Sequence, residues 1–292
     1  MDYNSIVKLV YDAKKIAISK KLKSKVSLKG KADYVTAVDL GISAYIKDGL
    51  KKIAPSVAFV TEEEDKHVSS GERFILDPID GTTNLVHGYK QSSISLAYFV
   101  NGRVEFGVVF SPFTYELFFA IKGKGAHFYS TRYGITNLLK IGIENYAKNL
   151  LKVSSLSRQD AIVEFGAGST KKHLADENFA IAKEVFTSCL DIRRICSTAL
   201  SICYIASGRI EGYFEKVIKV WDYAASSLIL EEAGGRISEW SGSPLKFVEP
   251  SSIIAGNVDT YDYLLNLLKN KLFTFARFSF ISKAKYFGLN GI

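Results

Sequence analysis

The sequence is poor in cysteine, and its three thiols form no pattern that binds a metal or builds a disulfide framework. Cys189, Cys196 and Cys203 are seven residues apart, with no Cys-x-x-Cys pair and no Cys/His spacing typical of a metal site. An odd count in a chain of 292 residues also argues against disulfide stapling. We expect buried free thiols, with the last two on one face of a helix.

Long hydrophobic runs are also missing. No stretch of about 18 apolar residues could span a bilayer, and the N-terminus lacks the basic, apolar and small-residue succession of a signal peptide. Internal repeats and low-complexity tracts are absent as well. With 47% hydrophobic and 23% charged residues, we expect a globular, cytoplasmic protein with one large or two moderate domains.

The net charge of +8 is concentrated at the two ends of the chain. Residues 1–32 hold nine lysines and two aspartates, and residues 269–292 hold five basic residues and no acid. A solvated lysine-rich helix face is the usual meaning of such a pattern, with RNA or membrane contact as the alternative. The aromatic, basic tail at 269–292 has no clear period, so packing, a subunit contact, a membrane surface and disorder all stay open.

Apolar spacing predicts a mixture of helices and strands. Helical periodicity runs from Ile6 to Ala17 behind Asn4 as N-cap, and again from Ile42 behind Asp39. From Val57 onward the period changes to that of strands, and the Asn-Gly pair at 101–102 predicts a hairpin within an antiparallel sheet.

The second half alternates strands and helices. We expect an N-terminal α+β half at 1–150 with most of the metal ligands, an α/β half at 151–268, and the tail. The polar stretch at 131–150 is a boundary or an insertion. Predicted strands lie near 150–153, 161–165, 210–214, 236–240 and 252–255, and predicted helices near 174–186, 195–207, 222–233 and 259–269.

The stretch FILDPIDGTTNLVHG, residues 74–88, places two aspartates three residues apart at the end of an apolar strand. Pro78 fixes one backbone torsion, so the Ile79 carbonyl and Asp80 take a defined direction and can converge with Asp77. Oxygen-only clusters of this kind suit Mg²⁺, which prefers carboxylate, carbonyl and water ligands. Taken alone, either aspartate fits an ordinary turn as well.

The residues that follow add a phosphate-binding feature. Gly81 allows a tight turn, and Thr82 and Thr83 open a short helical segment whose first N–H groups lack intrahelical partners. Such groups bind phosphate. Metal-seeking carboxylates beside phosphate-seeking amides are what phosphoryl transfer needs, because that chemistry depends on positioning and charge neutralisation.

Four segments together carry a family resemblance. DYVTAVD, FVTEEE, LDPIDGTTNLVHG and VWDYAASSLILEEAGG resemble the signature segments of the inositol monophosphatase family, within the Mg²⁺-dependent, Li⁺-sensitive phosphomonoesterases. The resemblance runs from about Asp33 to Leu268, and DPIDGTTN joined to a downstream Trp-Asp is a highly specific match. It implies an α+β fold layered α/β/α/β/α, of the sugar-phosphatase type, and a homodimer.

The resemblance also implies roles for individual residues. The implied ligands of two or three Mg²⁺ ions are Glu62, Asp77, the Ile79 carbonyl, Asp80 and Asp222. Thr82 with Asp39 would orient and deprotonate the attacking water, and the carboxylate is needed because a threonine hydroxyl is no base unaided. Locally, Asp39 and Asp222 also fit helix caps. The implied substrate contacts are Gly81, Thr82, Thr83, Glu215, Ser197 and Thr198.

The implied reaction is the Mg²⁺-dependent hydrolysis of a small polyol or sugar phosphate, with inositol monophosphate as the first substrate. Fructose 1,6-bisphosphate and 3′-phosphoadenosine 5′-phosphate are alternatives, because relatives with this metal core divide those substrates among them. A different class of function is an RNA- or protein-binding regulator that uses the basic ends and retains the metal site.

The sequence departs from the family pattern in two places. Cys196, Ser197 and Thr198 stand where the family commonly has Gly-Ser/Thr-Ala, which makes the pocket bulkier there. The stretch that begins at His127 is longer than usual by about twenty residues, a surface-loop insertion by length. These departures bear on the substrate and not on the hydrolysis.

Overall fold

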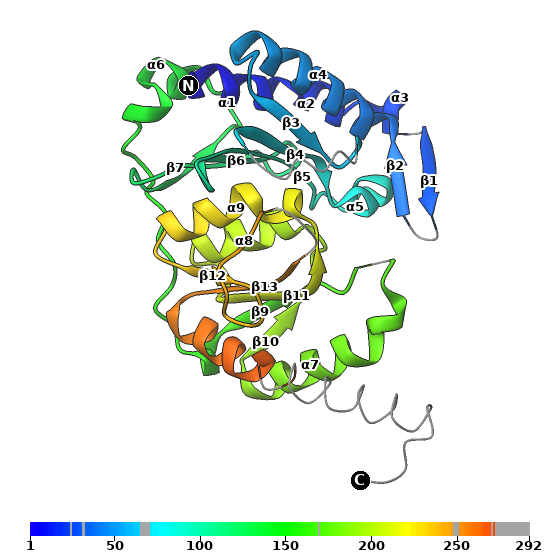
Figure 1. The fold of residues 1–292 in the computed structure, drawn as a ribbon, viewed down its shortest axis with the longest axis vertical. Helices are drawn as coiled ribbons and strands as arrows, with labels where there is room; N and C mark the ends of the chain where they lie inside the picture. The colour runs from blue at the N-terminus through cyan, green and yellow to red at the C-terminus, as the bar shows by residue number, and fades with distance from the viewer. Residues whose placement is uncertain are drawn as a thin grey trace.

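The computed structural model describes residues 1–23, 25–30, 33–64, 71–168, 170–247, 251–269 and 271. Its elements stack in five layers, helix, sheet, helix, sheet, helix, from the top to the bottom of Figure 1. Three hydrophobic cores fill the spaces between the layers. The predicted α/β/α/β/α sandwich is therefore confirmed.

The first layer is built from amphipathic helices with capped ends. It contains α1 (Tyr3–Asp12), α2 (Lys14–Ala17), α3 (Lys20–Lys23) and α4 (Ala37–Ile53). Asp2 caps α1 by accepting the Ser5 amide at 3.0 Å, so the predicted cap at Asn4 is wrong. At α4, Thr36 and Asp39 form a capping box, which fixes Asp39 in the first helical turn.

The second layer is a six-stranded sheet in the order β3-β4-β5-β6-β7-β8. β3 pairs parallel with β4, and the other neighbours pair antiparallel. Alternation along β5 sends Leu96 into the core under the first-layer helices and Ala97 into the core below. The strands are β3 (Ala58–Thr61), β4 (Arg73–Asp80), β5 (Ser93–Val100), β6 (Arg103–Ser111), β7 (Glu116–Ile121) and β8 (Ala126–Ser130).

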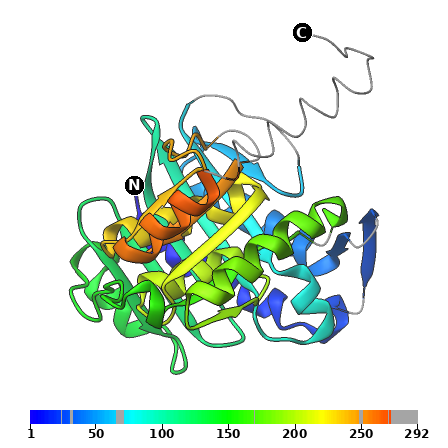
Figure 2. The ribbon, with the colours of Figure 1, turned by 90° about the horizontal axis from the view of Figure 1, so that it is seen from below.

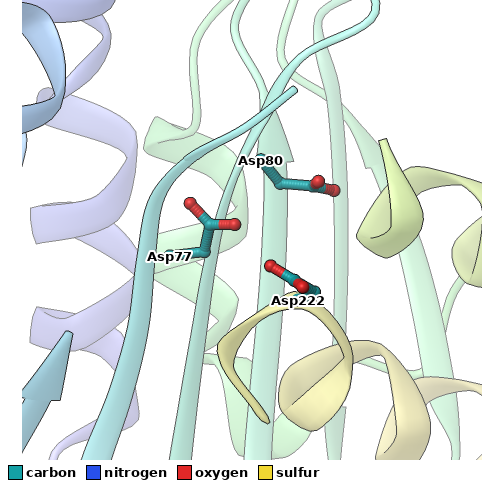
Figure 3. Close-up of side chains that lie close together, drawn as sticks. All are labelled: Asp77, Asp80 and Asp222. Atoms are coloured by element: carbon teal, nitrogen blue, oxygen red, sulfur yellow. The ribbon is translucent and has the colours of Figure 1, made fainter. Parts of the chain in front are cut away.

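The third layer holds two buried helices, α8 (Thr198–Ala206) and α9 (Val220–Glu232). Gly107 in β6 allows α9 to lie close to the sheet above, because a Cβ there would be 2.4 Å from the Ala225 carbonyl oxygen. This close approach matters for the site, since α9 carries Asp222 toward the end of β4 (Figure 3).

The fourth layer is a five-stranded sheet in the order β10-β9-β11-β13-β12. β9 pairs parallel with both β10 and β11, whereas β13 pairs antiparallel with β11 and β12. Helix α7 (Ala175–Ser188) and the helix at 258–269 form the fifth layer (Figure 2). The strands are β9 (Ile162–Phe165), β10 (Asp191–Arg193), β11 (Gly212–Ile218), β12 (Arg236–Ser238) and β13 (Ser251–Gly256).

A two-stranded hairpin and a short helix lie at one end of the layers, on the right of Figure 1. The hairpin joins β1 (Val26–Gly30) to β2 (Asp33–Thr36), and the helix is α5 (Thr82–His87). α5 begins directly after Gly81, at the end of β4, so the predicted helical segment is present.

The stretch at 131–150 is packed against the rest of the molecule. It forms α6 (Thr136–Ile141) and the 3-10 turn η1 (Ile143–Asn145). Leu138, Ile143 and Tyr146 belong to the hydrophobic core between the first-layer helices and the six-stranded sheet. The predicted strand at 150–153 is wrong: Leu150 forms a single bridge to His127, and residues 151–157 have no regular structure. Two further 3-10 turns are η2 (Arg158–Asp160) and η3 (Lys172–Leu174).

Four further expectations have different outcomes. The three cysteines are free thiols, but Cys196 is exposed and precedes α8, so it does not share a helix face with Cys203. The tail lies outside the described residues from 272 onward, and the domain division stays a prediction. Among the described helices, none is long and apolar enough to cross a bilayer.

Candidate active site

Three carboxylates from distant parts of the sequence meet between the second and third layers. Asp77 and Asp80 come from β4 and Asp222 from the first turn of α9. One oxygen of each lies within 4.8 Å of one oxygen of both others. Figure 3 shows the three side chains pointing toward one another.

The structure holds Asp77 and Asp80 in place by hydrogen bonds. Asp77 Oδ1 accepts the Ile79 amide at 2.9 Å, which stabilises the turn at Pro78. Asp80 lies at the start of α8, where its Oδ2 accepts the Ser197 hydroxyl and the Ala199 amide, both at 2.7 Å. Asp80 thus joins the first sheet to the third-layer helices.

Asp222 occupies the third position of its helix, so the predicted helix N-cap role is wrong. The N-cap of α9 is Lys219, whose amide donates to Asp222 Oδ2 at 3.1 Å. The physical reason is that an acid at this position reaches back to the cap residue in a capping box. One carboxylate oxygen thereby completes the helix start, and the side chain is brought to the cluster.

The crowding of these acids changes their protonation. Burial, followed by the charges of Glu62 and Asp80, raises the pKa of Asp77 well above its usual value. Burial and the Asp80 charge do the same to the pKa of Asp222. Burial also raises the pKa of Asp80, against the bonds from Ser197 and α8 that lower it. Such a cluster is destabilised at neutral pH unless a cation compensates it.

Glu62 lies close to this cluster without being part of its tightest group. It follows β3 in a turn, is half-buried, and lines the adjoining cavity. Its charge contributes to the raised pKa of both Asp77 and Asp222. Glu62 is therefore placed where it could bind a cation together with them.

Thr82 and Asp39 are in contact across the start of α5. The Thr82 hydroxyl lies 3.1 Å from Asp39 Oδ1 and 3.0 Å from the Ile79 carbonyl oxygen, and its single proton can be donated to one of them at a time. Asp39 Oδ2 accepts the amide and the hydroxyl of Thr36. Burial raises the pKa of Asp39, despite the bonds from Thr36 and Thr82 that lower it.

A cavity of about 350 Å³ adjoins the cluster, a volume that suits a small-molecule site. Of the predicted substrate residues, five line it and one does not. Ser197 is buried and directs its hydroxyl to Asp80. The lining residues among those predicted are Gly81, Thr82, Thr83, Thr198 and Glu215.

Glu215 is held by a buried hydrogen-bond network at the cavity wall. Tyr213 donates its hydroxyl to Glu215 Oε2 at 2.6 Å, and the Thr198 hydroxyl lies 2.9 Å from that of Tyr213. Burial raises the pKa of Glu215 to about 7, against the Tyr213 bond that lowers it. Gly166 allows this placement, because a Cβ there would lie 2.2 Å from the Glu215 carboxyl group.

The sequence reasoning missed several lining residues. Tyr213 had a usable signal, because residues two apart on a strand share a face and Glu215 follows it at that spacing. Cys196, which the sequence already placed at the pocket, lines the cavity with a left-handed φ of 59°, a conformation that favours glycine. Lys172 and Arg194 also line the cavity, and no sequence pattern singles them out.

The donor set fits a hard divalent cation. It consists of carboxylates whose oxygens converge within 4.8 Å and whose pKa values are raised by burial and, for Asp77 and Asp222, by the charges of their neighbours. Oxygen-only ligands of this charge suit Mg²⁺ better than softer metals that prefer sulfur or imidazole. Asp77, Asp80 and Asp222 would hold the cation, with Glu62 beside them.

Comparisons with known proteins agree with this geometry. Residues 3–272 match the model of the inositol monophosphatase family. The Nus factor SuhB of Salmonella typhimurium is 33% identical over 249 residues, covering 84% of this chain and 86% of that protein. Inositol-1-monophosphatase of Rhizobium meliloti is 36% identical over 241 residues, covering 80% and 81%.

A solved structure supports the fold as well. The extragenic suppressor protein suhB of Bartonella henselae superposes with a TM-score of 0.78 at 30% identity, covering 91% of this chain and 98% of that one. The predicted family resemblance is confirmed, and it extends beyond residues 33–268 toward both ends.

Proposed function

Because the chain belongs to the inositol monophosphatase family, we propose that it is a Mg²⁺-dependent phosphomonoesterase that hydrolyses a small polyol phosphate, inositol monophosphate first. The observation that supports this most is the convergence of Asp77, Asp80 and Asp222 beside the Thr82–Asp39 contact. Ligands for a cation and a proton acceptor for water are thereby side by side. Phosphoryl transfer requires both.

Thr82 and Asp39 handle the proton of the attacking water in this proposal. Thr82 Oγ1 accepts a proton from water and passes its own to Asp39 Oδ1, 3.1 Å away. The capping box with Thr36 holds Asp39 still, and burial makes its carboxylate a stronger base by raising its pKa. A positioned base of this kind contributes roughly 10²- to 10⁴-fold to a rate.

The acidic cluster would hold two or three Mg²⁺ ions. When bound, Mg²⁺ neutralises phosphate oxygens and makes a water molecule more acidic. The N–H groups of Gly81, Thr82 and Thr83, at the first turn of α5, would hold the remaining phosphate oxygens. Ser197 and the start of α8 keep Asp80 oriented throughout.

The polyol is proposed to contact Glu215 and Thr198. Glu215 Oε2 accepts the Tyr213 hydroxyl, and Oε1 is the acceptor proposed for a substrate hydroxyl, because Glu215 lines the cavity. A buried acceptor left unpaired is unfavourable, and a substrate that lacks this hydroxyl would therefore bind less well. The same reasoning supports a sugar phosphate as an alternative substrate.

A panel of three phosphates tests the proposal. Inositol monophosphate, fructose 1,6-bisphosphate and 3′-phosphoadenosine 5′-phosphate are assayed for phosphate release with Mg²⁺ and with a chelator. We expect Mg²⁺-dependent turnover of inositol monophosphate that the chelator abolishes and Li⁺ inhibits. Absence of turnover with all three would count against the phosphatase.

A second function is favoured by one comparison. The similar protein of Salmonella typhimurium carries the name Nus factor, and exposed lysines such as Lys15, Lys20 and Lys21 cover the first helices here. We propose as the alternative an RNA- or protein-binding regulator. RNA retention that weakens with salt and vanishes when residues 269–292 are removed, with hydrolysis unchanged, would support it.

Family membership also supports a homodimer. Light scattering on the purified full chain should give twice the chain mass, and a monomer at micromolar concentration would contradict this expectation.

A further inference from the structure

Two cations line the cavity together with the catalytic threonine, and neither belongs to the proposed hydrolytic machinery. Lys172 begins η3, at the end of the loop that follows β9, and Arg194 directly follows β10. Both side chains are exposed at the cavity wall. Thr82 and Thr83 of α5 belong to the same lining, and α5 lies above the segment that enters α7 in Figure 1.

The topology explains why these cations meet. β9 and β10 are parallel neighbours, with Ile192 opposite Val163 and Arg193 opposite Glu164. The carboxyl ends of parallel strands lie at one edge of the sheet, which is where ligands bind in such sheets. Gly166 and Arg194 therefore leave the sheet side by side. β11, the other parallel neighbour of β9, brings Glu215 to the same edge.

Neither cation forms an ion pair within the described part of the chain, although the Arg194 charge lies near enough to Glu215 to oppose the burial that raises the pKa of that carboxyl. No carboxylate of the described residues lies within 4.0 Å of Lys172 or Arg194, whereas the neighbouring Arg193 pairs with Asp191 and Lys216 pairs with Glu177. Arg194 lies over the Phe165 ring, with its guanidinium carbon 5.9 Å from the ring centroid. An unpaired arginine stacked at a cavity wall keeps its donors available for an anion.

The loop that leads from β9 to Lys172 leaves space for a ligand. Gly166, Ala167 and Gly168 line the cavity, and the only side chain among them is the methyl group of Ala167. A ligand can therefore come close to the backbone of this loop. Gly168 has a φ of +48°, a left-handed conformation that favours glycine. A bulky side chain here would fill the space next to Lys172.

We propose that Lys172 and Arg194 form a second anion subsite, which binds a phosphate group that is not hydrolysed. The inference rests on the proposed function and adds that, among the substrates of this site, compounds with a second phosphate bind more tightly than their monophosphates. The phosphate to be cleaved lies at the carboxylate cluster, and the second phosphate lies at the two cations across the cavity. A fixed arginine and a nearby lysine recognise such a group by charge-assisted hydrogen bonds.

Matched pairs of substrates test this subsite, because each pair differs by the second phosphate alone. Fructose 1,6-bisphosphate is compared with fructose 1-phosphate, and 3′-phosphoadenosine 5′-phosphate with 3′-AMP. The variants are Lys172→Ala, Arg194→Ala and the double variant. Arg193→Ala, which removes a paired neighbour, and Lys183→Ala, on the exposed side of α7, are the controls.

We expect each single variant to lower kcat/KM for a bisphosphate about tenfold and to change that for its monophosphate less than twofold. The advantage of the bisphosphate should shrink as salt rises, because exposed charges are screened. Whichever pair shows the loss identifies a sugar or a nucleotide as the source of the second phosphate. Equal losses for both members of each pair, or losses as large in the controls, would overturn the subsite.

A binding measurement separates this proposal from the phosphatase proposal. Calorimetry with the Asp39→Asn variant in Mg²⁺ should give tighter binding of a bisphosphate than of its monophosphate, and Arg194→Ala should remove the difference. If turnover is absent but this difference is present, the hydrolysis proposal fails and the subsite stands. If turnover is present and both ligands of each pair bind equally, the subsite fails alone.

Discussion

At the scale of residues, Asp80 connects the chemistry to the fold. Its side chain comes from β4, accepts hydrogen bonds from Ser197 and the start of α8, and still reaches the cluster with Asp77 and Asp222. Burial raises the pKa of all three acids, and the charges of neighbouring carboxylates raise those of Asp77 and Asp222 further, so the cluster is unfavourable without a cation. A site that is unfavourable by itself is typical of function.

The Asp80→Asn substitution removes a charge and keeps the volume. We expect the variant to fold and kcat/KM for inositol monophosphate to fall at least about 100-fold, since a ligand of the cation and part of its charge compensation are lost. Steady-state kinetics and a far-UV circular dichroism spectrum measure the two effects. Activity equal to that of the parent would remove Asp80 from the site.

The Tyr213→Phe substitution tests how Glu215 is positioned. It removes the bond that lowers the pKa of Glu215, so that pKa should rise further above about 7. Loss of one hydrogen bond is worth about 1 kcal/mol, so KM for inositol monophosphate should rise roughly 3- to 10-fold at neutral pH with little change in kcat. The acidic limb of the kcat/KM profile should move to higher pH. An unchanged KM and pH profile would contradict this role.

At the scale of elements, helix starts place the candidate site. α4 brings Asp39, α8 holds Asp80, and α9 carries Asp222, each within a first helical turn or at its start. α9 can do so because Gly107 admits it close to the sheet. The distance between β4 and α9 therefore depends on a residue far from the chemistry.

Substitution of Gly107 by alanine should move α9 away from the sheet. A Cβ would lie 2.4 Å from the Ala225 carbonyl oxygen, which is backbone and cannot rotate away. Overpacking of this kind costs about 1–3 kcal/mol of unfolding free energy. Urea denaturation measures that loss, with Gly41→Ala in α4 as the control, because its added Cβ would meet only the Ile16 side chain, at 3.1 Å. Equal stability of Gly107→Ala and the parent would show that α9 is not held by this contact.

Much of the element order could be predicted from the sequence, because apolar period and turn chemistry are local. The hairpin at Asn101-Gly102 and the helix after Gly81 are examples. The strand expected at 150–153 failed because the Leu151 and Val153 amides donate to different elements, to Ala126 of β8 and to Ala233 after α9, so no continuous ladder forms. Capping positions were shifted by two residues at Asn4 and by three at Asp222, because several polar residues near a helix start can interact with its first amides.

The candidate site was predictable only where a motif carried it. The pairing of Ser197 with Asp80 needs the contact between β4 and α8, which are 117 residues apart at these positions. Arg194 and Lys172 reach the cavity through the parallel pairing of β9 and β10, and no periodicity contains that information. Which of these residues meet at the site depends on tertiary contacts, which local sequence patterns do not contain.

At the scale of the whole molecule, the acidic cluster makes stability depend on pH and on Mg²⁺. Carboxyl groups with a raised pKa in the folded state bind protons more tightly there than in the unfolded chain. Their contribution to stability is complete below the unfolded value near 4 and is lost as pH rises through the folded pKa values, about 6 in the case of Asp80. A bound cation that neutralises the charge of the carboxylates restores this contribution to stability.

We therefore expect the Mg²⁺-induced rise in Tm to be larger at pH 8 than at pH 5. In metal-free buffer, the contribution of the cluster should decline as pH rises from about 4 through the folded pKa of Asp80, about 6. Differential scanning fluorimetry with Mg²⁺ and with a chelator measures the difference, and Asp80→Asn serves as the control because its cluster has one charge fewer. A rise in Tm that is equal at both pH values would speak against coupled acids.

The most direct test of the account is anomalous diffraction from a crystal grown with Mn²⁺ and phosphate, since Mn²⁺ takes the same oxygen ligands as Mg²⁺. We predict Mn²⁺ peaks bounded by Asp77, Asp80 and Asp222, with phosphate beside Thr82. Peaks confined to other parts of the molecule, with these three carboxylates bound to protein donors alone, would contradict the account.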